Sequence, residues 1–362
     1  MAQSHSGQLR TTENSPRVCR KNLRLWIMIL LLGCIPFLSP VTLAVANTLQ
    51  TDTQTPATTS ETETTPAPPV FPIAAQFVQP AWGVPGYEIP LALTSNDHFY
   101  FSRPLSIRTD HKITTDYRYG YYYPEADVTH TGIDISGTRG EPVFAAASGK
   151  VFFTGIGLLF GANDKEDPYG LAVMIRHDFS FNGYTLYTVY AHLDKITVSK
   201  GDWVDAGSKI GIVGMTGSTS GPHLHFEVRI ENALGNKVQN PELWLAPTTG
   251  HGVLVGHVET TNGVLMSSKN LWLKSLETGK NWTIVTYAPK IKQVDDYYQE
   301  NFSVGELPAG NYEISTYYNY KFYKTTIFIS PGAVNYVKFH GTAGFSTNLP
   351  QISESDFLKP VQ

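Results

Sequence analysis

Cysteine is nearly absent from this 362-residue chain, whose two cysteines, Cys19 and Cys34, both lie within the first 46 residues. The remainder therefore forms no disulfide, and a metal site in it would use histidine and carboxylate ligands. Charged residues are also few, at 16%, whereas 41% of the residues are hydrophobic and 12% are aromatic. This composition is sufficient for a buried core and excludes a wholly disordered chain.

Positive charge is scarce outside the N-terminal segment. The chain has a formal charge of −4, but residues 1–46 contain five basic residues and one acidic residue. The other 22 basic and 30 acidic residues give the rest of the chain a formal charge of −8. An acidic body has no general attraction for a phosphate backbone, so we expect no nucleic-acid partner.

Residues 1–46 are predicted to be a signal peptide or an N-terminal membrane anchor. A basic patch at 17–24 precedes an almost unbroken apolar run at 25–35, and an Ala-Val-Ala end at 44–46 suits signal peptidase. This end and two prolines favour cleavage, although the uncharged stretch is long enough to span a bilayer. A lipoprotein cysteine at Cys34 fits less well, because apolar residues follow it. Each alternative predicts a secreted or cell-envelope protein whose body lies outside the cytoplasm.

Composition divides the rest of the chain into four segments. Residues 47–70 are rich in Thr and Pro, contain no aromatic residue and are predicted to be a disordered linker. Residues 71–250 are predicted to form a first domain with an N-terminal strap. Residues 251–343 are predicted to form a second, smaller β-sandwich domain, and residues 344–362 a tail.

The expected fold class is all-β. Short runs rich in β-branched and aromatic residues alternate with glycine turns, and no helical period of useful length is present. The strands at 312–318 and 324–330 are expected to pair across a turn centred on Asn319. The predicted strands lie at 143–147, 150–154, 172–177, 185–192, 223–230, 312–318 and 324–330.

Five residues stand out by their spacing as a metal and proton-transfer set: His130, Asp134, His192, His223 and His225. In a strand, residues two apart project from the same face, so His223 and His225 face one space. Neutral imidazoles and one carboxylate suit a catalytic zinc ion, which takes three protein ligands and leaves a position for water. Three of the five residues could be ligands, which leaves two histidines for proton transfer and charge stabilisation.

These residues belong to motifs that follow one another in order. The motifs are His-Thr-Gly-Ile-Asp at 130–134, Gly-Glu-Pro-Val-Phe-Ala-Ala-Ala at 140–147, Tyr-Ala-His-Leu at 190–193, Gly-Asp-Trp-Val at 201–204, Gly-Ser-Lys-Ile-Gly at 207–211 and Gly-Ser-Thr-Ser-Gly-Pro-His-Leu-His-Phe-Glu at 217–227. Together they resemble the lysostaphin/LytM-type zinc endopeptidases, which cut peptide bridges in bacterial peptidoglycan. The resemblance covers about residues 99–247, somewhat under half of the chain.

The resemblance implies a LytM-type antiparallel β-sandwich or half-barrel as the catalytic domain. It assigns His130, Asp134 and His225 as ligands of Zn²⁺, and His192 and His223 as the catalytic pair that does not bind the metal. We favour His223 as the general base. The second domain is expected to be a transthyretin- or Ig-like sandwich.

The expected function is zinc-dependent hydrolysis of peptide bonds in peptidoglycan stem or crosslinking peptides, for cell-wall remodelling. Members of this family that have lost a ligand act as activators, whereas this chain retains all five residues. The alternative is a non-catalytic protein that binds the wall or regulates a hydrolase. The motifs do not distinguish glycyl bridges from D-alanyl–diamino-acid bonds or peptides outside the wall, and they specify no oligomeric state.

Four further features have two interpretations each. The insert at 155–170 is either a wall of the substrate groove or a surface loop. The tyrosines at 117, 119 and 121–123 form either an aromatic wall or, as we prefer, part of the core. Residues 201–211 also resemble a lipoyl or biotinyl carrier, but Lys209 lies in an expected strand rather than at a hairpin tip. Tyrosines of the second domain either bind glycan or a partner, or the domain is a spacer.

Overall fold

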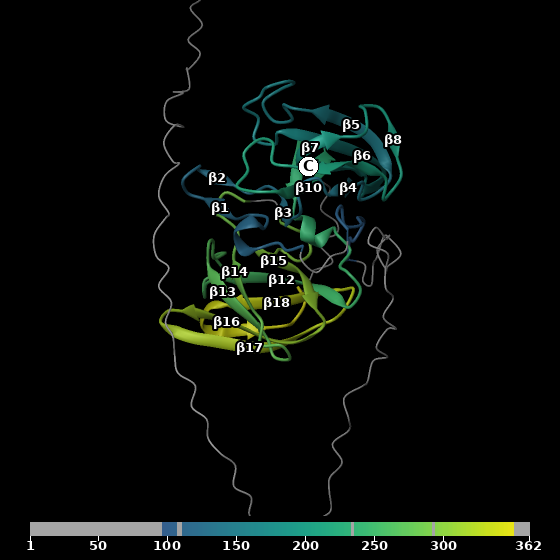
Figure 1. Cartoon of the computed structure of the whole chain (residues 1–362). Helices are drawn as coiled ribbons and strands as arrows, with labels where there is room; N and C mark the ends of the chain where they lie inside the picture. The colour runs from purple at the N-terminus through teal and green to yellow at the C-terminus, as the bar shows by residue number, and fades with distance from the viewer. Residues whose placement is uncertain (1–95, 107–110, 233–234, 292–293, 351–362) are drawn as a thin grey trace, which may run out of the picture. The chain divides into compact units, whose positions relative to one another are not determined.

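The computed structural model describes residues 96–106, 111–232, 235–291 and 294–350, and these are almost entirely strands, turns and loops (Figure 1). They belong to one compact unit, Ile73–Gln362. The all-β prediction is confirmed for the described ranges. The predicted leader and linker lie outside them. No helix in the described part of the chain is long and apolar enough to cross a membrane.

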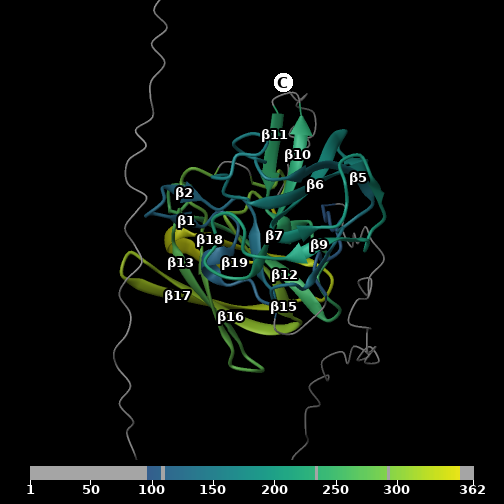
Figure 2. The same cartoon turned by 45° about the horizontal axis from the view of Figure 1, so that its top comes forward.

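The first group of strands forms a large antiparallel sheet. Its members are β3 (Ile133–Ser136), β4 (Pro142–Phe144), β5 (Gly149–Gly155), β6 (Leu171–Phe181), β7 (Tyr184–Ile196), β8 (Trp203–Val204), β9 (Lys209–Val213), β10 (His223–Asn232) and β11 (Gly235–Gln239). The main order is β11-β10-β7-β6-β5-β8, with β3 paired to β10 and β9 paired to both β4 and β7. Figure 2 shows β10 and β11 side by side. The predicted strands of this region are confirmed with small changes in their ends.

Alternation along β10 separates a core face from a polar face. Leu224, Phe226 and Val228 are fully buried in the main hydrophobic core. The intervening His223, His225 and Glu227 project from the other face, because successive strand residues point to opposite sides. Lys209 begins strand β9, as the sequence predicts, so it does not lie at a hairpin tip.

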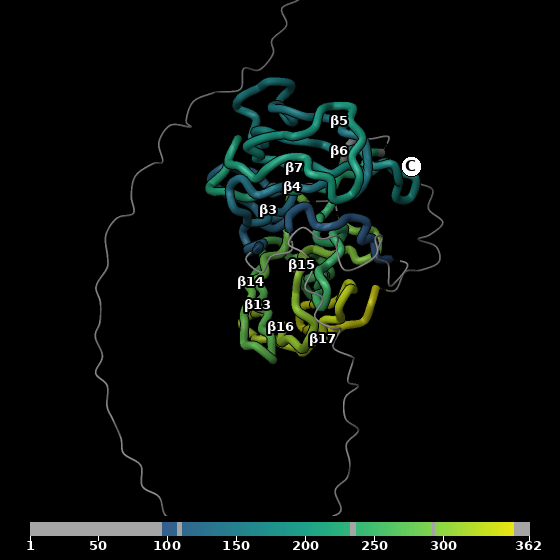
Figure 3. The backbone as a smooth tube through the Cα atoms, turned by 45° about the vertical axis from the view of Figure 1, so that its right-hand side comes forward, coloured from purple at the N-terminus to yellow at the C-terminus, as the bar shows by residue number. Residues whose placement is uncertain are grey.

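The second group of strands forms two four-stranded sheets that share one hydrophobic cluster. The strands are β12 (His251–Glu259), β13 (Asn270–Ser275), β14 (Asn281–Val285), β15 (Phe302–Pro308), β16 (Gly310–Tyr318), β17 (Lys321–Ile329), β18 (Val334–His340) and β19 (Gly344–Ser346). One sheet has the order β15-β12-β18-β19 and the other β14-β13-β16-β17. Figure 3 shows β13, β14, β16 and β17 of the second sheet together.

The predicted hairpin at Asn319 is confirmed. Tyr318 pairs with Lys321, so Asn319 and Tyr320 form a two-residue turn. Both have positive φ, 46° and 63°, as a turn that matches the right-handed strand twist requires.

A short segment before the large sheet packs on the second group of strands. It comprises η1 (Thr115–Tyr117), β1 (Tyr122–Tyr123) and β2 (Val128–Thr129), and the other short helices are η2 (Pro241–Leu243) and η3 (Gly341–Ala343). The amide of Ala288 donates to the carbonyl of Gly120 at 2.8 Å, and the Gly120 amide donates to the carbonyl of His130 at 2.9 Å. Gly120 has φ 79°, and a Cβ there would lie 2.5 Å from Cδ1 of Tyr287. Only glycine fits this close approach.

Candidate metal centre

Three ligand-type side chains converge at the junction of β2, β3 and β10. His225 of β10 pairs directly with Asp134 of β3, and His130 follows β2. Oδ1 of Asp134 lies 2.8 Å from Nδ1 of His225 and 3.1 Å from Nε2 of His130. The two histidine nitrogens are themselves 3.1 Å apart. All three residues are buried, and one ligand atom of each lies within 4.8 Å of the others.

The second nitrogen of each histidine is occupied by an acceptor. Nδ1 of His130 donates to the carbonyl of Arg118 at 3.0 Å, and Nε2 of His225 donates to Oε1 of Glu227 at 3.1 Å. These bonds orient both rings and leave Nε2 of His130 and Nδ1 of His225 facing Asp134. Such outer contacts select the tautomer that a metal needs.

In the metal-free cluster, the surroundings favour an ionised Asp134 and a protonated His225. Burial opposes ionisation of Asp134, but hydrogen bonds from His130 and His225 outweigh it and hold the pKa of that carboxyl well below its usual range. Burial likewise disfavours the charged form of His225, yet Asp134 and Glu227 raise its pKa to about 9. Metal binding therefore has to displace a proton from His225.

Glu227 holds His225 in place, a contact for which the sequence analysis assigns no residue. It is fully buried. Besides His225, it accepts hydrogen bonds from the hydroxyls of Thr131 at 2.5 Å and Tyr169 at 2.6 Å, and from Arg229 at 2.6 Å. Its position two residues after His225 was the available signal, because that spacing places both side chains on one face of the strand.

His192 and His223 lie beside this cluster, with ring centroids 4.8 Å apart. Nδ1 of His192 donates to the carbonyl of Thr216 at 2.9 Å, and Nδ1 of His223 donates to that of Gly221 at 2.8 Å. Nε2 of His223 is buried without a hydrogen-bond partner among the described residues. It lies 3.5 Å from Oδ2 of Asp134. Because Nδ1 is the donor in both rings, Nε2 of each is unprotonated, and that of His223 has no partner in the described ranges.

The backbone at His192 is unusual, and the sequence gives no sign of it. Its φ is 61°, a conformation that costs free energy for a residue with a Cβ and is often retained at functional sites. Burial, together with the neighbouring His225 and His223, lowers the pKa of His192 to about 3. Burial also lowers the pKa of His223, where Asp134 acts in the opposite direction.

A chain of contacts connects the cluster to the second group of strands. The Arg118 guanidinium forms an ion pair with Glu242, and both side chains are largely buried, at 12% and 2% exposed. Glu242 also accepts from the Ser303 hydroxyl at 2.8 Å and from the Gly305 amide at 2.7 Å, both in β15. Because the Arg118 carbonyl holds His130, strand β15 supports a residue of the metal cluster.

Of the tyrosines that precede His130, one lies in the core and two lie beside the metal cluster. Tyr119 is 2% exposed and packs against Tyr287, as the preferred interpretation predicts. Tyr117 and Tyr123 are half-buried and border the site, with ring centroids 6.4 Å from His223 and 6.0 Å from His130, respectively.

The insert at 155–170 lies on the same face of the sheet as the metal cluster. Its Tyr169 donates to Glu227, and its Leu158 packs on a small cluster that includes Met174 and Val189. The carboxylate of Asp167 accepts from the amides of three insert residues, Leu159, Phe160 and Tyr169. The insert thus packs on the face that carries the site, and its role as a wall of the substrate groove stays a prediction.

Residues 128–241 match the model of Peptidase family M23. The chain is 42% identical over 118 residues to the DD-carboxypeptidase/endopeptidase Mpg of Neisseria meningitidis, covering 32% of this chain and 24% of the relative. It is 39% identical over 106 residues to the peptidoglycan DD-endopeptidase ShyB of Vibrio cholerae, covering 29% and 21%. It is 35% identical over 106 residues to lipoprotein NlpD of Yersinia enterocolitica, covering 29% of this chain and 95% of the relative.

The chain spans about a quarter of the length of the first two of these relatives. Among solved structures, it is similar to a zinc-containing peptidase from Vibrio cholerae. That similarity has 32% identity, covers 38% of each chain and has a TM-score of 0.30.

Proposed function

The chain belongs to peptidase family M23, and we propose that it is a zinc-dependent endopeptidase that hydrolyses peptide bonds in peptidoglycan. The observation that carries the proposal is the arrangement of His192 and His223. Each has Nδ1 committed to a backbone carbonyl, and the two rings lie together beside the buried cluster of His130, Asp134 and His225.

The residues of the cluster fit a zinc ion. Two imidazole nitrogens and one carboxylate oxygen are the donors of many catalytic zinc sites, and here they converge with their rings already oriented by Arg118 and Glu227. His130, Asp134 and His225 would hold the metal. When bound, zinc supplies Lewis acidity, which polarises a carbonyl group and lowers the pKa of water.

We assign general-base catalysis to His223. Its unpaired Nε2 accepts a proton from the attacking water, and the resulting imidazolium is stabilised by Oδ2 of Asp134, 3.5 Å away. The water oxygen then bonds to the scissile carbonyl carbon, the carbon–nitrogen bond breaks, and His223 returns its proton to the departing amine, which leaves a carboxyl group on the other product.

His192 is assigned to charge stabilisation. Its Nδ1 bond to Thr216 fixes the ring with Nε2 available to the reacting group. Burial keeps the ring neutral in the free protein. As negative charge develops on the scissile carbonyl oxygen, Nε2 takes up a proton from solvent and donates a hydrogen bond to that oxygen.

Peptidoglycan is the proposed substrate because relatives of this chain carry peptidoglycan endopeptidase names and the motifs of 130–227 are shared with wall-cutting enzymes. An extracytoplasmic location, in the cell envelope or secreted, follows from that substrate. The acidic body of the protein agrees with a substrate other than nucleic acid.

Incubation of the zinc-loaded protein with isolated peptidoglycan tests the proposal. Mass spectrometry of released fragments is expected to show new peptide termini that disappear when a chelator removes zinc. Fragment masses also identify the bond. Peptidoglycan left intact by protein with bound zinc would contradict the proposal and support the alternative of a non-catalytic wall-binding or regulatory protein.

A further inference from the structure

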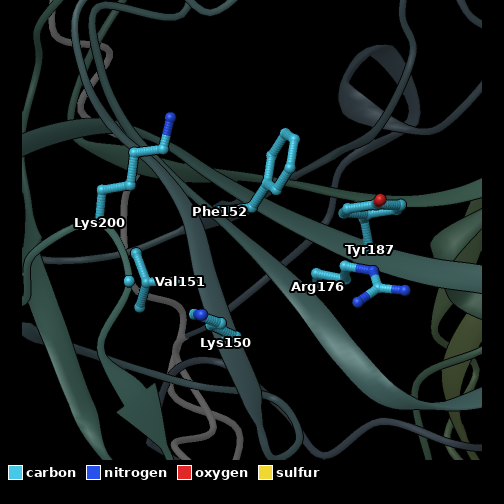
Figure 4. A pocket seen from close by; sticks show the side chains of 7 residues that line it. Lys150, Val151, Phe152, Arg176, Tyr187 and Lys200 are labelled. Carbon is cyan, nitrogen blue, oxygen red and sulfur yellow. The ribbon is translucent and has the colours of Figure 1, made fainter.

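A hollow lies on the large sheet away from the metal cluster. It has a volume of about 650 Å³ and is lined by Lys150, Val151 and Phe152 of β5, Arg176 of β6, Tyr187 of β7, and Lys200 and Gly201 before β8. Figure 4 shows the three cationic side chains around the two aromatic rings. Strand pairing explains the grouping, since Lys150 lies opposite Arg176, and Arg176 lies opposite Tyr187.

In the described part of the chain, the three cations of this hollow have no carboxylate partner. Within the described ranges, Lys150, Arg176 and Lys200 form no ion pair with an acidic residue. Some lysines elsewhere in the described ranges do form such pairs, for example Lys324 with Glu313 at 2.7 Å. The local cluster therefore carries three unneutralised positive charges on a body that is acidic overall, and it attracts anions.

The floor of the hollow is aromatic. The Phe152 ring is 49% exposed and contacts Tyr187 edge-on at 5.5 Å, while the Lys200 ammonium lies 5.9 Å from the Phe152 ring centre. The nearby carboxylate of Glu231 accepts a hydrogen bond from the Tyr187 hydroxyl at 2.6 Å. A ligand with both carboxylates and apolar surface matches this combination.

The hollow and the metal cluster occupy the same face of the sheet. Ala191 lies opposite His225, and Tyr187 lies opposite Arg229, so residues 187, 189 and 191 project with the residues of β10 that form the site. Tyr187 and Ala191 are four residues apart, about 13 Å along the strand, and β5 lies two strands from β7, about 10 Å across the sheet. Leu158 of the insert packs on Met174 and Val189 between the two sites, so a peptide of a few extended residues that covers this separation passes over the insert.

We propose that this hollow is a subsite that binds free carboxylates of the substrate peptide, several residues from the bond held at the metal cluster. The proposal rests on the proposed endopeptidase function. The ligand class is an acidic peptide, recognised by charge at Lys150, Arg176 and Lys200 and by apolar contact with Phe152.

The test compares two synthetic crosslinked stem peptides of one sequence, with free side-branch and α-carboxylates or with those carboxylates amidated. The site variant is Lys150→Gln/Arg176→Gln/Lys200→Gln. The control variant is Lys195→Gln/Lys209→Gln/Lys274→Gln, which removes the same charge from exposed positions elsewhere. Equilibrium binding to the full zinc-loaded chain is measured alongside hydrolysis.

The wild type and the control are expected to bind the carboxylate peptide about fivefold to tenfold more tightly than the amidated one, since exposed ion pairs contribute modestly. The site variant is expected to lose this preference, with a raised KM for the carboxylate peptide and an unchanged kcat. The preference should also shrink as salt is added.

Two results would overturn the subsite. One is an unchanged preference in the site variant. The other concerns binding of a soluble glycerol-phosphate polymer, measured for the wild type and the site variant. If the site variant loses binding of this polymer but binds both peptides as the wild type does, the anion is a phosphate polymer and not a peptide. Failure of the proposed endopeptidase function gives a different result. The wild type, the site variant and the control variant would then all fail to hydrolyse the peptides, while their binding affinities could still be compared.

Discussion

Nε2 of His225 donates a hydrogen bond to Oε1 of Glu227 at 3.1 Å, while Nδ1 of the same ring lies 2.8 Å from Oδ1 of Asp134. Glu227 thereby decides which nitrogen of His225 is available to a metal. It is also held in place by Thr131, Tyr169 and Arg229, so its carboxylate has little freedom to move. The orientation of a predicted ligand is thus set by a residue that would not itself touch the metal.

Glu227→Gln is expected to weaken zinc binding about 10- to 100-fold, the usual effect of losing such an outer contact. The neutral amide accepts less strongly from His225 and leaves Arg229 without its partner. Competition with a chromogenic chelator measures the affinity. Glu231→Gln, on the same strand, is the matched control and should bind zinc as the wild type does. Wild-type affinity in Glu227→Gln would refute this role.

The five clustered residues are expected to separate into two groups on substitution. Asp134→Ala or His225→Ala should lose zinc and hydrolysis together. His192→Ala should retain zinc and lower kcat about 100-fold or more, the usual scale for a lost acid–base group. Metal analysis of each purified variant, followed by peptide hydrolysis, makes the comparison. If His192→Ala cleaved at the parental rate, the two-histidine scheme would be wrong.

The buried ion pair between Arg118 and Glu242 is expected to support both folding and the metal cluster. Glu242→Ala leaves the Arg118 charge buried and unpaired, which should lower the free energy of unfolding by about 3–5 kcal/mol. It should also weaken zinc binding about tenfold, because the Arg118 carbonyl orients His130. Urea denaturation of the metal-free protein and chelator competition measure the two effects.

The control for this pair is Arg139→Ala, which removes an ion pair with Asp194 whose arginine side chain is 63% exposed. That variant should unfold at nearly the wild-type urea concentration and bind zinc normally, because exposed pairs contribute little. Equal stability losses in the two variants would argue against a special role of the buried pair.

Stability is expected to fall as the pH rises towards 8 because of Glu300. Burial, reinforced by Asp295, raises the pKa of this fully buried carboxyl to about 8. A raised folded-state pKa means that the folded protein holds a proton that the unfolded chain releases at about pH 4.5. The stabilisation from protonated Glu300 is complete below pH 4.5. Between that pH and the folded-state pKa of about 8 it is lost at about 1.4 kcal/mol per pH unit.

Glu300→Gln stays neutral and should therefore lack this loss. Urea midpoints are compared at pH 5 and pH 8. The midpoint of the variant relative to that of the wild type should be higher at pH 8 than at pH 5. Glu166→Gln, at an exposed position, should follow the wild-type profile. Parallel profiles for Glu300→Gln and the wild type would contradict the predicted titration.

Much of the fold class and the identity of the clustered residues could be predicted because they depend on local patterns. The alternation along 223–230 predicts that His223 and His225 share a face, and β10 has this arrangement. The two-residue hairpin at Asn319 follows from turn chemistry in the same way. The roles of Arg118, Glu227 and Glu242 could not be predicted, because each depends on a neighbour brought in by tertiary packing.

Local sequence was enough to predict the strands, their faces and the residue types available for metal binding, since spacing along a strand dictates which side chains project together. Only the tertiary structure decided that Asp134 lies opposite His225, 91 residues away, and that β15 supports Arg118 through Glu242. A turn fixes the register of two strands that it joins, but β3 and β10 are far apart in the chain, so their pairing depends on how the whole core packs.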